Sequence, residues 1–328
     1  MKQQSRVLRE AIRFLKACII PVGMWVLFAV ITGGRTATQR MLINTLRQSV
    51  MPSIVCYGLI LNMSVGMLNF SGGAMMLLAG IIGGNLAKIT NTGIPGMLVF
   101  IIAISVAVGL LTGVLYNLLR VPCIVLTIGL MLVWEAVPKV IYPNGLNIKA
   151  KMALLARNPH CFYVLIICLI VFYVIYNLTA FGHNLRAIGN NQGIANSVGL
   201  DSDKIKLKSF VLGAVFMGVA AVLYMSERGE VRNMQTMGSI SIMMDGFMGM
   251  FIAMFLSKYC DMSIAVVFGT FSMKMLTNGF VAMGISSTMR DVTQGFFLLV
   301  LLVISANSGL LEKRRADKKF AEECRKTA

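Results

Sequence analysis

The stretch IPGMLVFIIAISVAVGLLTGVLYNL, residues 94–118, decides the fold class of this chain. It contains no charged side chain, and it exceeds the roughly 20 apolar residues that a helix needs to cross the hydrocarbon core of a bilayer. Across all 328 residues, 57% are apolar and 13% are charged, whereas a soluble domain carries about 25% charged residues. Because lipid cannot hydrogen-bond to an exposed backbone, the sequence predicts an all-α, polytopic bundle of helices in a membrane.

About ten transmembrane helices are predicted along the chain. More of the 30 Lys and Arg fall in segments expected inside than in segments expected outside, and basic residues accumulate on the cytoplasmic side of membrane proteins. Both termini are therefore expected inside. The apolar run at 17–31 is interpreted as a retained first helix, because no small-residue cleavage site follows it. The ten segments lie at approximately 14–32, 50–67, 72–89, 94–118, 122–141, 160–179, 208–226, 239–257, 262–281 and 290–308.

The sequence argues against several other functions. The net charge of +17 comes from basic residues at the two ends and in short loops, without interleaved aromatic residues, so no nucleic-acid partner is expected. The seven cysteines contain no CxxC pair, and His160 and His183 lack metal-ligand spacing, so neither a metal site nor another cofactor is expected. The sequence has no GxxxxGK[ST] phosphate loop and no GxSxG elbow. The chain is therefore expected not to be an enzyme.

One apolar run is interrupted at VGMLNFSGGAMM, residues 65–76, where Asn69, Ser71, Gly72 and Gly73 occur together. Glycine weakens a helix, and the Asn and Ser side chains offer partners to freed backbone groups. One interpretation is a break between two membrane helices, buried in protein or facing an aqueous cavity. The other is a short inner loop whose small residues let helices pack closely. The sequence leaves both open.

Strongly polar side chains also lie within predicted helices, at Glu135, Asp245, Lys274 and Asn278. Such residues usually face a partner or a water-filled path. Asp245 and Lys274 fall on neighbouring segments and could pair, either as a structural bridge or as an element of transport. Asp245, with the residues of the helix break, is a candidate for the transport pathway. Glu135 follows Trp134 and is expected near the membrane interface.

A polar, Gly- and Asn-rich segment, FGHNLRAIGNNQGIANSVGLDSDKIKLK, occupies residues 181–208. It is longer than a connection between helices needs, so it is interpreted as a surface for another protein. Asn190 or Asn191 is expected to cap a short helix that runs to about Ser197 and stops at Gly199. A small apolar side, formed by Ile194, Ala195 and Val198, is expected to hold this helix against the protein.

These segments resemble permease subunits of bacterial ABC importers of the ribose/galactose/xylose type, which are related to branched-chain amino acid permeases. GHNLRAIGNNQGIANSVGL resembles the family pattern G-R-x-x-x-A-I-G-x-N-x-x-A-A-x-x-S-G-I. VGMLNFSGGAMMLLAG resembles I-D-L-S-V-G-S…A-L-A-G, NLLRVPCIVLTIGLM resembles the V-P-x-F-I-x-T-L-G-M block, and MMDGFMG lies where the family has L-D-A-I-A-A. The similarity covers about 45–309. Asn69 replaces the family's acidic residue, and Glu135 stands where an Arg is usual.

The resemblance implies a type II importer fold and a set of partners. Two permease subunits, identical or different, would form the pathway. A cytoplasmic ATP-binding subunit would grip the coupling segment, and an extracytoplasmic binding protein would deliver a sugar or sugar-like solute. The residues implied in coupling are Gly182, Arg186, Ala187, Ile188, Gly189, Asn191, Ala195, Ser197 and Gly199.

The expected organisation is a cytoplasmic basic N-terminus at 1–16, one transmembrane permease domain at 17–308 and a charged cytoplasmic tail at 309–328, in a bacterial cell membrane. The coupling segment spans 182–207. Two alternatives remain open. The solute could be a nucleoside, an autoinducer or a branched-chain amino acid. The chain could instead be an ion-coupled secondary transporter that uses Glu135, Asp245 and Lys274 as coupling charges.

Overall fold

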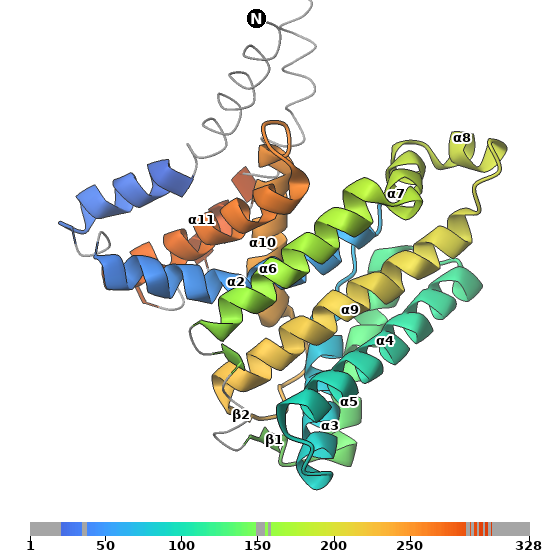
Figure 1. The fold of residues 1–328 in the computed structure, drawn as a ribbon, viewed down its shortest axis with the longest axis horizontal. Helices are drawn as coiled ribbons and strands as arrows, with labels where there is room; N and C mark the ends of the chain where they lie inside the picture. The colour runs from blue at the N-terminus through green and yellow to red at the C-terminus, as the bar shows by residue number, and fades with distance from the viewer. Residues whose placement is uncertain are drawn as a thin grey trace, which may run out of the picture.

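A computed structural model describes residues 21–34, 38–148, 155–156 and 159–286, with scattered positions between 289 and 303. The described residues form a bundle of helices (Figure 1), as the sequence predicts. After an apolar helix at Pro21–Ile31, the helices in chain order are α2 (Gln39–Met63), α3 (Gly72–Ile89), α4 (Gly93–Leu119), α5 (Cys123–Ile141), α6 (His160–Tyr173), the π-helix η3 (Val174–Leu178), α7 (Ala180–Asn190), α8 (Gln192–Ser197), α9 (Ser202–Arg228), α10 (Ile240–Leu256) and α11 (Met262–Ala282).

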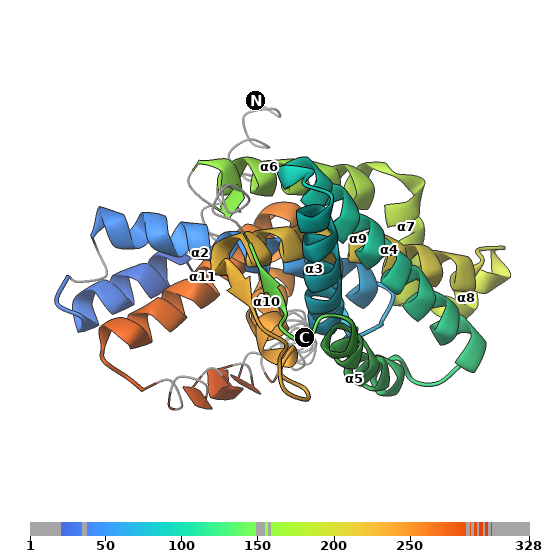
Figure 2. The same ribbon diagram turned by 90° about the horizontal axis from the view of Figure 1, so that it is seen from below.

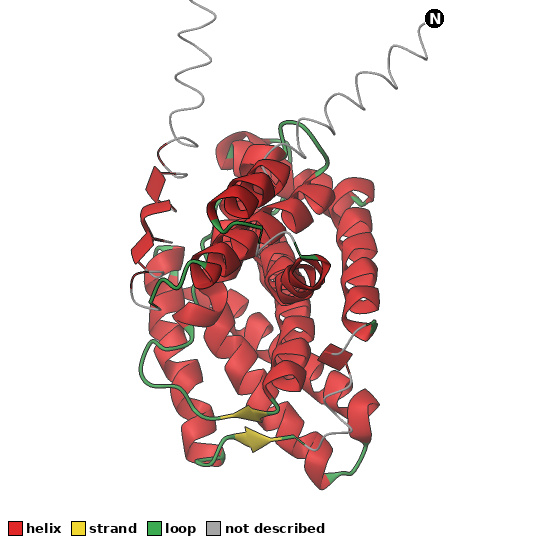
Figure 3. Cartoon of the chain, turned by 90° about the vertical axis from the view of Figure 1, so that its left-hand side faces the viewer, coloured by secondary structure: helices red, strands yellow, loops and turns green. Residues whose placement is uncertain are grey.

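Six of the described helical spans are long and apolar enough to cross a membrane: α3, α4, α5, α6 with η3, α9 and α11. The helix at Pro21–Ile31 and α10 are apolar but shorter. By length and composition, these spans are those of a multi-pass membrane protein. Two short strands, β1 (Leu146–Asn147) and β2 (Glu230–Val231), pair antiparallel at one end of the bundle (Figure 3).

The eight predicted segments between residues 50 and 281 each coincide with a described helix. The second helix was predicted to start near residue 50, and this start is wrong, because α2 begins at Gln39. Its polar side chains are accommodated by bonding to the helix backbone: Thr45 Oγ1 donates to the Met41 carbonyl at 2.8 Å, and Ser49 Oγ to the Leu46 carbonyl at 2.7 Å. The predicted stretches 1–16 and 309–328 lie outside the described residues, as does most of 290–308.

Helix α9 runs through the centre of the bundle and packs against α4, α2 and α3 (Figure 1). Small residues let α4 and α9 approach closely, since a Cβ atom at Gly109 would overlap the Ala214 side chain. An aromatic cluster joins α2, α6 and α9, with the Tyr57 and Phe172 ring centroids 4.6 Å apart. The Tyr57 hydroxyl donates to the Ser263 carbonyl of α11 at 2.9 Å. These contacts fix the bundle from which the polar segment α7–α8 projects.

Candidate functional site

The polar segment predicted as a protein-binding surface folds into two helices, α7 and α8, at one side of the molecule (Figure 2). The π-helix η3 ends α6, and Thr179 then caps α7 by accepting a hydrogen bond from the Gly182 amide at 3.3 Å. Leu185 and Ile188, one turn apart, are buried on the inner face of α7. Helix α7 was not predicted from the sequence, because a segment rich in Gly and Asn has little helix propensity.

Two glycines let α7 lie directly on the bundle. A Cβ atom at Gly182 would overlap the Tyr176 carbonyl, and one at Gly189 would overlap the Ser64 carbonyl at the end of α2. Both neighbours are backbone atoms, which cannot move aside as a flexible side chain can. The α7–α8 segment is therefore in direct contact with the point at which the α2 helix ends.

Arg186 faces the junction between α7 and η3. Its guanidinium lies 4.9 Å from the centroid of the Tyr176 ring, and its Nη2 atom is 2.9 Å from His183 Nδ1. Its Nε atom also donates to the Gly182 carbonyl at 3.2 Å. Ala187, on the next position of α7, is exposed. Arg186 thus joins α7 to Tyr176 of η3 through a cation–π contact, while its two polar contacts lie within α7 itself.

Asn191 separates α7 from α8, and the predicted short helix is confirmed. Its backbone is extended, and its side-chain oxygen accepts from the Ile194 amide at 3.1 Å, which caps α8. Ser197 Oγ donates to the Ile194 carbonyl at 2.8 Å. Gly199 follows with a φ of +91°, a conformation that glycine adopts readily. The chain then enters α9, where hydrogen bonds from the Lys204 side chain and amide lower the pKa of the capping Asp201 carboxyl.

The predicted apolar contact side of α8 is only partly present. Ala195 is buried, but Ile194 is 63% exposed and Val198 is 78% exposed. The expectation that all three hold the helix to the protein is wrong for Ile194 and Val198, because the short helix Gln192–Ser197 turns only Ala195 toward the protein and Val198 lies beyond its end. Two large apolar side chains are thus left exposed on a polar segment.

The break predicted near Asn69 is present between α2 and α3. Asn69 and Ser71 are 3% and 0% exposed, so this non-helical backbone lies within the bundle and not in a solvent-exposed loop. The Asn69 side-chain oxygen accepts from the Ser71 amide at 3.0 Å and from the Ser71 hydroxyl at 2.7 Å. The Phe70 amide donates to Thr127 Oγ1 of α5 at 3.2 Å. The buried interpretation of the break is therefore the one that the structure supports.

The N-terminus of α3 meets the N-terminus of α10 directly after this break. Gly72 lies against the Met243 side chain, and the Gly73 amide donates to Met243 Sδ at 2.7 Å. A Cβ atom at Gly73 would overlap the Ser239 carbonyl. Two helices thus begin side by side inside the bundle, an arrangement found where discontinuous helices surround transport sites.

Glu135 of α5 holds the start of α10. This side chain is 4% exposed, and its two carboxylate oxygens accept from the Met237 and Ser239 amides, each at 2.8 Å. The expected position near the membrane interface gives no hint of this role, because the amides lie about a hundred residues away in sequence. A carboxylate at a helix N-terminus is stabilised by the helix dipole.

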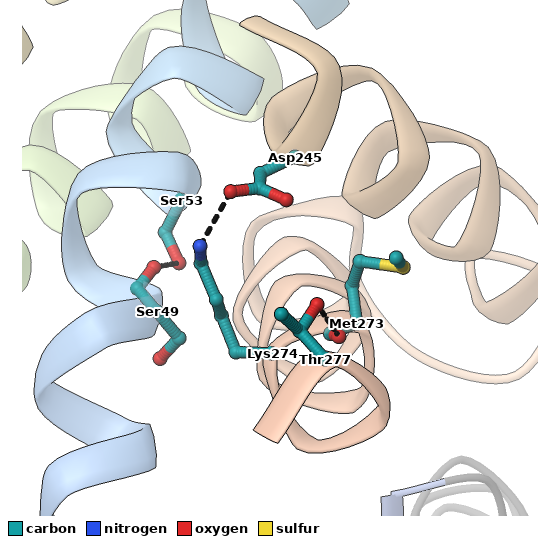
Figure 4. Close-up of polar contacts among 6 residues, drawn as sticks. All are labelled: Ser49, Ser53, Asp245, Met273, Lys274 and Thr277. Carbon is teal, nitrogen blue, oxygen red and sulfur yellow. Dashed lines mark hydrogen bonds and ion pairs between the residues drawn. The ribbon is translucent and has the colours of Figure 1, made fainter. Parts of the chain in front are cut away.

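Asp245 of α10 and Lys274 of α11 form the ion pair that the sequence allowed. Figure 4 shows the Lys274 ammonium pointing at Asp245, with Ser49 and Ser53 of α2 beside it. Ser53 Oγ donates to the Ser49 carbonyl at 2.7 Å. Asn278, one turn beyond Lys274, donates to Thr45 Oγ1 at 3.0 Å. The polar residues within these helices therefore connect α11 to α10 and to α2.

No group of three or more His, Cys, Asp or Glu side chains that could hold a metal ion occurs among the described residues. The structure brings the predicted residues into three regions: the α7–α8 segment, the buried break at Asn69–Gly73, and the Asp245–Lys274 pair. Gly189 lies against Ser64 at the end of α2, a few residues before the second region, and Met243 of α10 lies against Gly72 and Gly73 of that region.

The family model described as "Branched-chain amino acid transport system / permease component" matches residues 41–305. Similar proteins include the "Autoinducer 2 import system permease protein LsrC" of Yersinia pseudotuberculosis serotype O:1b (strain IP 31758), 24% identical over 43% of this chain and 42% of that protein. Proteins of the same name from Photorhabdus luminescens and Enterobacter sp. (strain 638) are 21% and 25% identical, over 64% and 58% of this chain and 65% and 60% of theirs. The chain thus matches less than two thirds of the length of these relatives. No solved structure matches it significantly.

Proposed function

Because the chain belongs to the permease component family of branched-chain amino acid transport systems, we propose that it is the transmembrane subunit of an ATP-binding cassette importer. It translocates a sugar or sugar-like solute that an extracytoplasmic binding protein delivers. ATP is hydrolysed by a separate cytoplasmic subunit, and a second permease subunit, identical or different, completes the pathway. The similar proteins named above are autoinducer 2 import permeases, which supports a sugar-like solute over a branched-chain amino acid.

The observation that carries this proposal is the α7–α8 segment. It exposes Ile194 and Val198 at its tip, and it rests through Gly189 on the Ser64 carbonyl, where the break between α2 and α3 begins. An ATP-binding subunit that moves this segment would push directly on the irregular backbone inside the bundle. The residues proposed to couple this segment to the ATP-binding subunit are Gly182, Arg186, Ala187, Ile188, Gly189, Asn191, Ala195, Ser197 and Gly199.

The proposed topology has ten transmembrane helices, with both termini in the cytoplasm. In this arrangement the segment 182–207 faces the cytoplasm and the β1–β2 ladder faces outward. Residues 1–16 and 309–328 are the cytoplasmic ends of a permease domain at 17–308. The described geometry supports the separation of the two faces, because α9 leads over 27 residues from α8 to β2, about 40 Å at 1.5 Å per residue.

The charges inside the bundle also favour an importer over an ion-coupled transporter. A coupling carboxylate must exchange its proton or ion during each cycle. Glu135 is instead engaged by two backbone amides, and Asp245 is paired with Lys274. The first arrangement stabilises the start of α10 and offers no open site for an ion.

The test is purification of the tagged chain from native membranes, with the co-purified subunits identified by mass spectrometry. An ATP-binding subunit that carries a phosphate loop is expected with the native chain. It should be lost from the double variant Ile194→Asp/Val198→Asp, which places charges on the exposed tip of α8. Ile89→Asp is the matched control, because Ile89 is also exposed, at the end of α3. Recovery of the chain alone, even after cross-linking, would overturn the proposal.

A further inference from the structure

A cavity of about 480 Å³ lies between α2, α9, α10 and α11. This volume falls within the range of about 300–1,000 Å³ that is common for small-molecule sites. Glu227 and Arg228, the last residues of α9, line it, so it lies near the β2 end of that helix and away from α8. The ion pair between Asp245 and Lys274 lines it as well.

The charges that line this cavity are balanced. Asp245 and Lys274 form one pair, with side chains 27% and 16% exposed. Glu227 and Arg228 supply one further charge of each sign. The lining therefore carries no net charge, and Arg47, which lies 3.9 Å from Glu227 outside the lining, adds one positive charge nearby.

The cavity also offers uncharged hydrogen-bonding groups. Gln48 and Tyr224 line it, and so does the exposed Ser241, whose hydroxyl donates to the Gly238 carbonyl at 2.7 Å and keeps its own oxygen as an acceptor. Pro52 has no amide hydrogen, so the Gln48 carbonyl one turn earlier lacks its usual donor within α2. The site thus combines donors and acceptors around one space.

The remaining lining is apolar and comes from Met51, Pro52, Met234 and Ile242. A sugar ring has hydroxyl groups at its edge and C–H groups on its faces. Such a molecule can direct its hydroxyls to the polar side chains and lay a ring face on the apolar ones. Every hydroxyl is both donor and acceptor, and can therefore bind either member of an ion pair.

We propose that this cavity binds a neutral, polyhydroxylated solute of monosaccharide size during its passage through the protein. The proposal rests on the proposed importer function and adds the site and the chemical class of its ligand. The pairing of Asp245 with Lys274 favours a neutral solute over a zwitterionic amino acid. A zwitterion would have to separate the two charges in order to bind them, whereas a hydroxyl can bond to the remaining donor and acceptor positions of the intact pair.

The first test measures binding alone. The full-length variant Ser241→Cys is purified in detergent, and its labelling by N-ethylmaleimide is followed with D-ribose, D-galactose, L-leucine or no solute. The unsubstituted chain sets the background from the native thiols. Ser286→Cys is the matched control, because Ser286 is exposed and does not line the cavity. At least one sugar is expected to slow labelling of Ser241→Cys, by about twofold when half of the sites are occupied, and to leave Ser286→Cys unaffected.

Two results would overturn the proposal: protection by L-leucine without protection by either sugar, and no protection by any of the three. The assay uses neither ATP nor a partner subunit. Suppose that a sugar protects Ser241→Cys from labelling but that no ATP-binding subunit co-purifies with the chain. These results together would contradict the importer function and still support the binding site.

The second test separates binding from a structural role of the ion pair. Asp245→Asn is expected to raise the sugar concentration that gives half protection by about tenfold, the effect of losing one charge-assisted hydrogen bond. Glu230→Gln is the control, because Glu230 pairs with Arg232 on the surface and does not line the cavity. If Asp245→Asn does not elute as a single species, Gln48→Ala replaces it. Unchanged half protection in a folded cavity variant contradicts the proposal.

Discussion

Glu135 Oε1 accepts a hydrogen bond of 2.8 Å from the Ser239 amide, which ties the middle of α5 to the start of α10. The second oxygen accepts from the Met237 amide at the same distance. No basic side chain is needed at this position, because the amides at the start of a helix supply the positive end of a dipole.

Replacement of Glu135 by Ala is expected to destabilise the protein by about 2–4 kcal/mol, since the buried Ser239 amide and the partly buried Met237 amide both lose their acceptor. Glu135→Gln keeps one acceptor oxygen and should lie between the native chain and the Ala variant. The measurement is the thermal midpoint in detergent, followed by fluorescence-detected size exclusion. Glu230→Gln serves as the control at an exposed carboxylate. Equal midpoints for Ala and Gln would show that hydrogen bonding is not the source of the effect.

Gly189→Leu is expected to separate α7 from the end of α2, because its side chain would meet the Ser64 carbonyl. The ATP-binding subunit should still bind, but its ATPase activity should no longer respond to the solute-loaded binding protein. Gly193→Leu is the matched control, since a Cβ there meets only the Asn191 side chain, at 3.4 Å. Normal solute uptake by a reconstituted Gly189→Leu transporter would show that the contact between Gly189 and Ser64 is not needed for coupling.

Asn69→Asp is expected to be tolerated far better than Asn69→Leu. Both hydrogen bonds of this side chain are accepted by its oxygen, from the Ser71 amide and hydroxyl, and an aspartate retains that oxygen. The Leu variant leaves the buried amide without its acceptor, a loss of about 1–3 kcal/mol. Abundance in the membrane and thermal midpoint report the difference. Similar losses in both variants would mean that the side-chain amide group has a role of its own.

Tyr57→Phe is expected to lower stability by about 0.5–1.5 kcal/mol, the net contribution of one hydrogen bond. The variant keeps the ring that stacks on Phe172 and removes only the bond to the Ser263 carbonyl. Tyr259→Phe, at a side chain that is 37% exposed, should leave the thermal midpoint unchanged. A loss as large as that of Tyr57→Ala would assign the effect to packing and not to the hydroxyl.

The helices could be predicted from sequence where apolar residues run without interruption, as at α3 and α4. The first part of α2 could not be predicted, because it contains the polar residues Thr45 and Ser49. Their hydroxyl groups are satisfied in the structure by hydrogen bonds to carbonyl groups of the same helix. The helix at Gln192–Ser197 was predictable from the local capping chemistry of Asn191.

The contacts that connect the candidate regions were not predictable, because they join distant segments. In the sequence Gly189 is only a residue of low helix propensity, and its close contact with Ser64 is visible only in the structure. The sequence suggests that Glu135 lies at the membrane interface, whereas the structure shows that it accepts a hydrogen bond at the start of α10. The pairing of Asp245 with Lys274 could be predicted from the sequence, because two opposite charges on neighbouring apolar helices have few other partners.

The π-helix Val174–Leu178 has a consequence for engineering this protein. A π-turn holds one residue more than an α-turn, and each residue of an α-helix turns the chain by about 100°. Deletion of one residue here would shorten the turn to an α-turn, whereas deletion within α6 would rotate the chain that follows by about 100° about the axis of α6 and carry Ile194 and Val198 to another side of the bundle. A chimera that receives α7–α8 from a relative can therefore absorb a difference of one residue at Val174–Leu178, but must preserve the residue count along α6.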